Sequence, residues 1–141
     1  MKKIWMIAVV VCAALMVACG GEKKADSVAS KAEQFAVQLY EAGLSDDAKK
    51  VEAALEALYN YGKDLPEDQQ QALLDAHVDA LAKKVANERV NGDKYFCDFG
   101  APKLIDKLAS IYVEMDERAR ATKFKDLAKD YYYKAIGLDK K

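Results

Sequence analysis

Apolar residues recur at helical spacing along most of this chain, and few residues interrupt them. Such spacing gives each helix one apolar stripe, which must be buried against another helix. Only two prolines and seven glycines occur among the 141 residues, which argues against a fold with many turns. Hydrophobic residues make up 52% of the chain, enough to build a core. The sequence therefore predicts an all-α fold, a small bundle of about five antiparallel helices.

Turn-forming residues divide the chain into these helices, and the first two have clear ends. The first runs from about Ser27 to Ala42 and ends at Gly43, a residue type common just after a helix. The second follows Ser45, a favourable N-cap, and ends at Gly62. Acidic residues directly after Ser45 suit the positive end of the helix dipole.

The third and fourth expected helices are separated by the longest irregular segment. The third begins at Pro66, which suits the first helical position, and ends at Asn91 before a glycine. The fourth begins near Pro102. Residues 93–100 lie between them and are expected to be irregular.

The fifth expected helix follows Thr122. Neither glycine nor proline separates it from the fourth, so the two are expected to be nearly continuous through Arg118–Ala121. Each helix has an apolar stripe that is expected to form the core. In chain order the stripes are Val28, Ala32, Phe35 and Leu39; Val51, Leu55, Leu58 and Tyr59; Leu74, Val78, Leu81 and Val85; Leu104, Leu108, Ile111, Tyr112 and Met115; and Phe124, Ala128, Tyr131, Ala135 and Leu138.

The first residues have the pattern of an export signal. Lys2 and Lys3 precede the apolar run Ile4–Ala18, and Cys19 and two glycines follow it. The run has fifteen residues, whereas a helix that crosses a bilayer needs about 20. An export signal is therefore a better interpretation than a membrane-spanning anchor.

The end of this run resembles the lipobox of bacterial lipoprotein signal peptides, with the sequence Leu15-Met16-Val17-Ala18-Cys19-Gly20. Val17, Ala18 and Cys19 match the pattern, and Met16 replaces the usual leucine. The resemblance implies that diacylglycerol is attached to Cys19 and that signal peptidase II cuts between Ala18 and Cys19. The alternative is an ordinary secretory signal, cut near Ala14 or Ala18.

The lipobox resemblance also implies an organisation and a location. Residues 1–18 form the signal peptide, residues 19–26 the lipidated cysteine with a polar tether, and residues 27–139 the helical domain. Two or more acyl chains hold a protein stably at a membrane, whereas one binds only marginally. Gly20 stands where an aspartate would retain a lipoprotein at the inner membrane of enteric bacteria. The outer membrane is therefore expected, with a domain that faces the periplasm rather than the cell surface.

Charge is unevenly distributed along the chain. The formal net charge is −1, which argues against a nucleic-acid-binding protein. Residues 22–80 carry 13 acidic and 6 basic side chains, and residues 118–141 carry 3 acidic and 8 basic ones. One interpretation is that these charges form two solvated faces or attract each other across the two ends of a single bundle. The other is a basic patch that meets anionic lipid headgroups or an acidic partner.

The C-terminal residues Ala128, Tyr132 and Ala135 lie at the small, aromatic and small positions of a tetratricopeptide repeat, which residues 109–141 resemble. Tyr112 and Met115 fit the aromatic and leucine positions of that family's first helix. A solenoid needs about three repeats for stability, and no earlier repeat is evident. The resemblance implies a concave face that binds a peptide or protein. The departures from the pattern are Asp116, Ala119 and Lys140.

Three consecutive tyrosines are the most conspicuous group near the C-terminus. Tyr131, Tyr132 and Tyr133 project about 100° apart on a helix, so at least one lies outside the core. One interpretation is that Tyr131 packs in the core and the others lie at its edge. The other is an aromatic binding surface shared with Lys129 and Lys134.

Cys97 and His77 provide a thiol and a potential base. Cys97 is the one cysteine after Cys19, so it is buried, paired between chains or reactive. Aromatic neighbours favour burial. A Cys97–His77 pair would be needed for a thiol nucleophile, and no oxyanion-hole glycine motif accompanies it. The alternative for His77 is a plain surface or boundary histidine on the third helix.

The chain lacks the usual signatures of metal and cofactor sites. One histidine and three cysteines are too few for a typical His/Cys metal site, and the sequence has no phosphate-binding loop or EF-hand motif. The acidic pairs Asp46–Asp47 and Glu67–Asp68 fit helix starts. Tyrosine can ligate haem iron, so an apolar cavity lined by Tyr59, Tyr95 or Tyr131 would indicate a small-ligand carrier. No cofactor is expected.

Together these features predict a non-enzymatic lipoprotein of the envelope with a helical binding or structural domain. Its expected partners are the membrane, bound through diacylglyceryl-Cys19, and an envelope protein. The alternatives are a tetratricopeptide-like adaptor, a small-ligand carrier and a thiol enzyme.

Overall fold

A computed structural model describes the backbone of residues 24–138 and the side chains from Val28 onward. The expected signal peptide, the segment that resembles a lipobox with Cys19, and residues 20–23 of the expected tether lie outside the described residues. So does Lys140, one of the departures from the repeat pattern.

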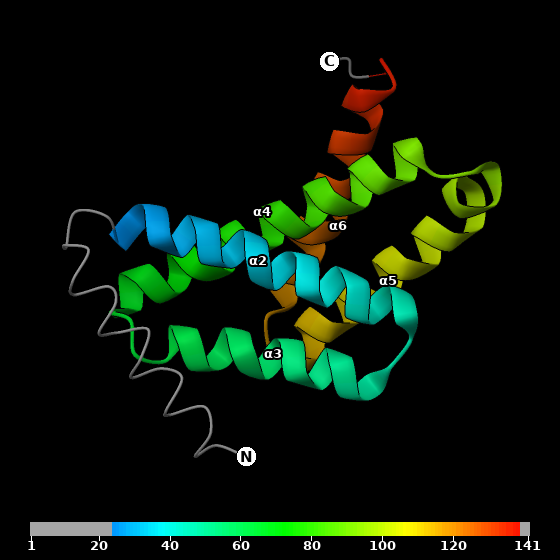
Figure 1. The fold of residues 1–141 in the computed structure, drawn as a ribbon. Coiled ribbons are helices and arrows are strands. Elements are labelled where there is room, and N and C mark those ends of the chain that lie inside the picture. Colours follow the sequence, from blue (N-terminus) through cyan, green and yellow to red (C-terminus); the bar gives the residue numbers. More distant parts are fainter. Residues whose placement is uncertain (1–23, 139–141) are drawn as a thin grey trace.

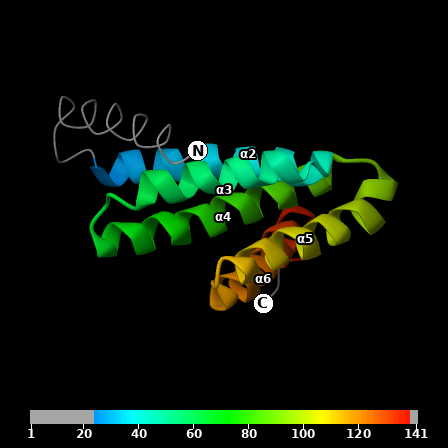
Figure 2. The same ribbon diagram turned by 90° about the horizontal axis from the view of Figure 1, so that it is seen from below.

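The described part of the chain is an all-α bundle, as the sequence predicts, and no strand occurs in it. Its five α-helices are α2 (Lys24–Ser45), α3 (Ala48–Gly62), α4 (Glu67–Asn91), α5 (Ala101–Glu114) and α6 (Arg118–Ala135), with the short π-helix η2 (Phe96–Gly100) before α5. The long α4 packs against α2 on one side and against α6 on the other. Figure 1 shows α6 crossing the far half of α4, while α5 runs back below α4. Figure 2 shows α2, α3 and α4 lying side by side.

Two groups of buried side chains hold the helices together. The central cluster draws on all five α-helices and includes Leu81 of α4, Leu108 and Tyr112 of α5 and Phe124 of α6. The terminal cluster draws only on α2, α3 and α4, and its buried residues are Val28, Ala32, Phe35, Leu58, Tyr61 and Leu73. The half-buried Met115 packs against both clusters.

The turn between α2 and α3 differs from the expectation by a few residues. Gly43 does not end α2, because the helix continues to Ser45 and turns at Asp46, whose φ is 60°. Asp47, not Ser45, caps α3 by accepting a hydrogen bond from the backbone N–H of Lys49 at 3.0 Å. Gly43 instead allows close packing, since a Cβ there would lie 3.0 Å from Leu108 Cδ2 on α5.

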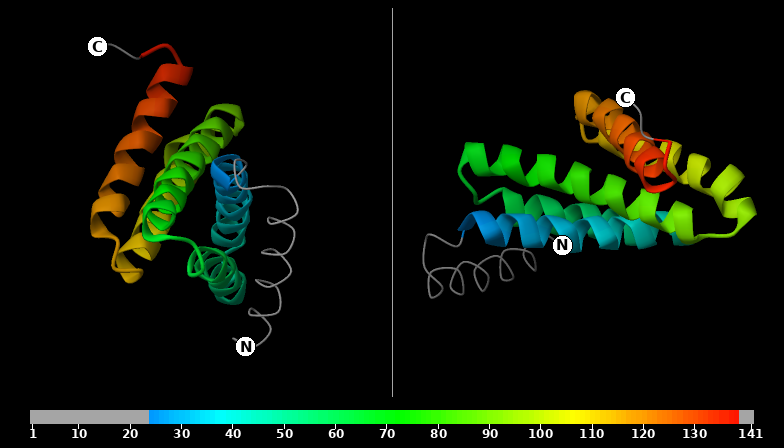
Figure 3. Two further views of the ribbon diagram at one scale, coloured as in Figure 1. Left: turned by 90° about the vertical axis from the view of Figure 1, so that its left-hand side faces the viewer. Right: turned by 90° about the horizontal axis from the view of Figure 1, so that it is seen from above.

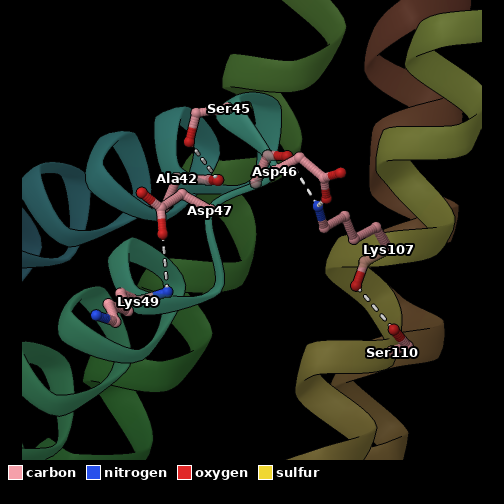
Figure 4. Close-up of polar contacts among 8 residues, drawn as sticks. Ala42, Ser45, Asp46, Asp47, Lys49, Lys107 and Ser110 are labelled. Atoms are coloured by element: carbon pink, nitrogen blue, oxygen red, sulfur yellow. Dashed lines mark hydrogen bonds and ion pairs between the residues drawn. The ribbon is translucent and has the colours of Figure 1, made fainter.

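A lysine of α5 fastens this turn to the rest of the bundle. Lys107 Nζ donates to the carbonyl of Gly43 at 3.2 Å and forms an ion pair with Asp46 (Figure 4). The same view shows Ser45 Oγ bonded to the Ala42 carbonyl and Ser110 Oγ bonded to the Lys107 carbonyl, both at 2.9 Å. The Lys107 contacts lower the pKa of the Asp46 carboxyl below its usual value.

The expectation of an irregular segment at residues 93–100 is wrong. Asp93 caps a helical turn by accepting from the backbone N–H of Phe96 at 2.8 Å, and η2 then runs directly into α5. A Cβ at either flanking glycine, Gly92 or Gly100, would lie 2.8 Å from the Phe96 ring. The glycines therefore make room for an aromatic ring in a tight helical turn instead of loosening the chain. α5 has Pro102 in its first turn, close to the predicted start.

The expected continuity between the fourth and fifth helices is also wrong. α5 ends at Glu114, and Asp116 adopts a φ of 65° before α6 begins at Arg118. An aspartate tolerates this left-handed conformation better than most residues do, which the search for glycine and proline missed. The tetratricopeptide resemblance aligns residues 112–119 with positions of one helix, whereas the structure places a turn within them.

The apolar stripes are correct for most of the core but fail at a few positions. Tyr59 is 66% exposed, and Leu138 is 60% exposed. Near the start of α4, Leu73 is buried in place of the expected Leu74, which is only half-buried, and Ala135 on α6 is exposed. These misplaced residues lie where a helix extends past its neighbours or where the bundle leaves a gap.

Candidate functional site

A groove of about 800 Å³ opens between α3 and the first half of α4. Figure 2 and the left view of Figure 3 show α4 lying between α6 on one side and α2 and α3 on the other. The groove has residues of α3, of α4 and of the turn between α5 and α6 on its walls, namely Glu52, Leu55, Glu56, Leu58, Tyr59, Asn60, Gly62, Lys63, Gln70, Leu73, Leu74, Met115 and Glu117. A volume of this size lies within the range typical of ligand-binding sites in proteins.

The groove exists because α3 packs mainly on α2 and contacts α4 at few points. The two helices approach each other at their connection, where a Cβ on Gly62 would lie 2.9 Å from Leu73 Cδ2. Gln70 stabilises that connection by donating to the carbonyl of Leu65 at 3.1 Å. Away from the connection, no helix of the described chain fills the space beside the terminal cluster.

The floor of the groove is apolar and its rim is mainly acidic. Leu55, Leu74 and Met115 are half-buried and leave part of their surface in the groove. Glu52 and Glu56 lie one turn apart on α3, so they line the same side of it. An exposed carboxylate beside partly exposed leucines would attract a ligand that is both apolar and cationic.

The third carboxylate of the rim is part of an ion-pair network. Arg120 contacts Glu117 at 2.5 Å and Asp75 at 3.0 Å, and it also donates to Gln71 Oε1 at 2.7 Å. These contacts join α6 to α4 across the turn between α5 and α6. Arg120 shares its one positive charge between Glu117 and Asp75. The carboxylates on the rim are those of Glu52, Glu56 and Glu117. Lys63 is the one basic residue on the described walls of the groove.

The three tyrosines of the predicted aromatic surface, residues 131–133, have different surroundings in the structure. Tyr131 is half-buried and donates to Asp79 of α4, which raises the pKa of Tyr131 to about 12. Tyr132 lies under the Arg89 guanidinium, 4.2 Å from ring centroid to Cζ. Tyr133 is exposed, with Lys129 Nζ 5.9 Å from its ring centroid.

These contacts tie the first two tyrosines to α4 and η2. They leave Tyr133, Lys129 and Lys134 as the exposed part of the predicted surface. The five residues therefore do not form one continuous binding face.

Cys97 lies half-buried in η2. Its Sγ is 3.0 Å from the hydroxyl of Tyr132, and its carbonyl accepts from Arg89 Nε at 3.0 Å. The hydrogen bond with the thiol raises the pKa of the Tyr132 hydroxyl. Cys97 thus joins η2 to α4 and α6.

His77 is 1% exposed in the middle of α4. Its Nδ1 is 2.6 Å from the Tyr112 hydroxyl, and burial lowers the pKa of His77 to about 4. His77 and Arg89 are twelve residues apart on α4, which is about 18 Å along a helix. Because Arg89 is the residue of α4 that contacts Cys97, the structure keeps His77 away from the thiol.

The remaining predicted ligand residues are dispersed. Of the three tyrosines considered for a ligand cavity, Tyr59 lines the groove, whereas Tyr95 stacks on Phe99 at the opposite end of α4 and Tyr131 bonds to Asp79. Within the described residues, no group of three or more His, Cys, Asp or Glu side chains could hold a metal ion. No helix in that part of the chain is long and apolar enough to span a membrane.

Three residues of the groove could be found in the sequence as apolar stripe positions. Helical spacing alone could not show that they line a groove. Leu55, Tyr59 and Leu74 belong to the predicted stripes, yet neighbouring helices cover them only in part. An apolar stripe shows which side of a helix avoids water, but not whether the chain supplies a helix to cover it.

Comparisons of the chain with protein-family models, with curated proteins and with solved structures find no match.

Proposed function

We propose that this protein is a non-enzymatic binding module of the bacterial envelope, anchored by lipid on Cys19. The observation that carries the binding role is the groove between α3 and α4, about 800 Å³ in volume with an apolar floor. The lipobox resemblance supports the anchor, and Gly20 supports delivery to the outer membrane. The mixed charges of residues 21–26 support a domain that faces the periplasm, because an acidic run there would favour export to the cell surface.

The mechanism is localisation followed by binding. Acylation would hold the helical domain at the membrane and raise its effective concentration for other molecules held there. The groove then supplies the contact surface, because partly exposed leucines gain free energy when a ligand removes them from water. Such a role needs no catalytic residue.

The contacts of Cys97 and His77 favour this role over a thiol enzyme. Each is bonded to a different tyrosine. Cys97 lies in η2 beside Arg89, which is about 18 Å along α4 from His77, so the two groups are too far apart for a proton transfer. A catalytic pair requires hydrogen-bond reach.

The anchor is tested by replacing Cys19 with serine in the full chain expressed in a Gram-negative bacterium. We expect the unchanged chain to incorporate radiolabelled palmitate and to sediment with outer membranes, and Cys19→Ser to lose both properties. Labelled palmitate in the serine variant, or outer-membrane sedimentation unaffected by it, would contradict a lipid anchor at this residue.

The binding role is tested with the domain from Gly20 onward, since both core clusters lie between Val28 and Ala128. The immobilised domain is exposed to solubilised envelope proteins. We expect a saturable ligand that Leu74→Glu abolishes. Leu44→Glu is the matched control, because Leu44 is 52% exposed and does not line the groove. Equal loss in both variants, or in neither, would rule out the groove as the binding site.

A further inference from the structure

The groove has the form of a vacant helix position in a bundle. At the end of the molecule that holds the terminal cluster, α2, α3 and α4 pack together, and neither α5 nor α6 contributes a buried residue to that cluster. Figure 1 shows these three helices extending to the left, past α5 and α6. Bundles of this kind are commonly completed by a fourth helix that covers the remaining apolar surface.

The length of the groove suits a short helix. Its wall on α3 runs from Glu52 to Lys63, which corresponds to roughly 16 Å at the rise of an α-helix. That is about three turns of a helix lying alongside α3. The half-buried Leu55, Leu74 and Met115 are spread over the floor, where they can receive apolar side chains from successive turns.

The charges on the rim determine which kind of helix fits. Glu52 and Glu56 are spaced one turn apart and would lie beside the flank of a helix in the groove. They favour lysine or arginine on that flank and repel carboxylates, phosphates and anionic lipid headgroups. Arg120 shares its one positive charge between Glu117 and Asp75, and Lys63 lies at the end of the wall, so the charged residues that line the groove remain acidic in sum.

We infer that the groove binds a basic amphipathic helix of a partner protein, about three turns long, with its apolar face on Leu55 and Leu74. This inference rests on the proposed function, because it names the ligand class of the same groove. The helix completes a local four-helix bundle and covers the part of the terminal cluster that the chain leaves open.

The test uses two synthetic 14-residue peptides as probes and the domain from Gly20 onward. Both peptides carry leucine at the same helical spacing, and all other positions are lysine in one and glutamate in the other. Binding is measured by fluorescence anisotropy at two salt concentrations. We expect the lysine peptide to bind at least about tenfold more tightly than the glutamate peptide, with an advantage that shrinks as salt is added.

A charge-reversal variant locates the interaction. Glu52→Lys combined with Glu56→Lys is expected to remove or reverse the preference for the lysine peptide. The matched control is Asp126→Lys with Asp130→Lys, which makes the same charge change at the same spacing on the exposed side of α6. Circular dichroism verifies that both variants keep the helical fold.

Two outcomes would overturn the inference. One is equal binding of the two peptides, and the other is an equal response of the two charge variants, which would indicate attraction to net charge alone. If Leu74→Glu still abolishes capture of an envelope ligand in either case, the groove remains the binding site and only the ligand class is wrong. If Leu74→Glu has no effect as well, the proposed function fails with it.

Discussion

The central and terminal clusters are built from the same kinds of side chain, yet they are completed to different degrees. In the central cluster, α6 packs on α4 and α5 packs on α6, and together these helices bury Tyr112, Leu108 and Phe124 almost completely. In the terminal cluster only three helices meet, and a groove remains beside Leu58 and Leu73. The comparison teaches that one end of the bundle serves mainly stability, while the other end retains apolar surface that a ligand can cover.

The largest expected effect on this comparison comes from removing the aromatic ring of α6 that is completely buried in the central cluster. Phe124 is 0% exposed in the central cluster, so Phe124→Ala should lower the free energy of unfolding by about 3–5 kcal/mol. Chemical denaturation of the domain from Gly20 onward, with and without the substitution, measures this loss in the free energy of unfolding. A loss below about 1 kcal/mol would show that the central cluster does not dominate stability.

Acid should weaken the same cluster through His77. Its pKa is about 4 in the folded chain against 6.5 when exposed, so the unfolded state takes up a proton first as the pH falls. The part of the folding free energy that depends on a neutral His77 is fully present above pH 6.5. It is lost between pH 6.5 and about 4, by roughly 3 kcal/mol in total.

Denaturant melts at a series of pH values measure this slope. His77→Gln removes the titrating group and should flatten the curve in that interval, whatever its effect on absolute stability. An unchanged slope in the variant would assign the pH dependence to other groups.

The smallest effect on stability is expected at the groove. Tyr59 is 66% exposed there, so Tyr59→Ala should change the free energy of unfolding by less than about 0.5 kcal/mol. Its effect on peptide affinity should be larger than its effect on stability, because the ring lies where the ligand would bind. Thermal melts and anisotropy on the same sample make the comparison, and a large loss of stability would place Tyr59 in the core.

Helical spacing predicted much of the central cluster because each buried residue there faces a partner helix. Val78, Leu81, Val85 and Leu108 are all buried as expected. The turns were less predictable. Asp116 provides the left-handed turn between α5 and α6 without a glycine, and Gly92 and Gly100 accommodate Phe96 inside a helical segment instead of ending one.

The candidate site was less accessible to sequence reasoning than the core. Tyr131, Tyr132 and Cys97 were identified as candidates, and the structure accounts for them by hydrogen bonds between α6, α4 and η2. The groove depends on how α3 is placed relative to α4, which is a tertiary property. Neither the spacing of Leu55 nor that of Leu74 reveals the gap between them.

The most direct test of the groove as the binding site is a nuclear magnetic resonance titration of the labelled domain with the lysine peptide. The account predicts saturable chemical-shift changes along residues 52–63 and around Leu74 and Met115, with little change at Tyr133 and Ile136 on the far end of α6. Changes centred on that end of α6, or none at saturating peptide, would contradict the account.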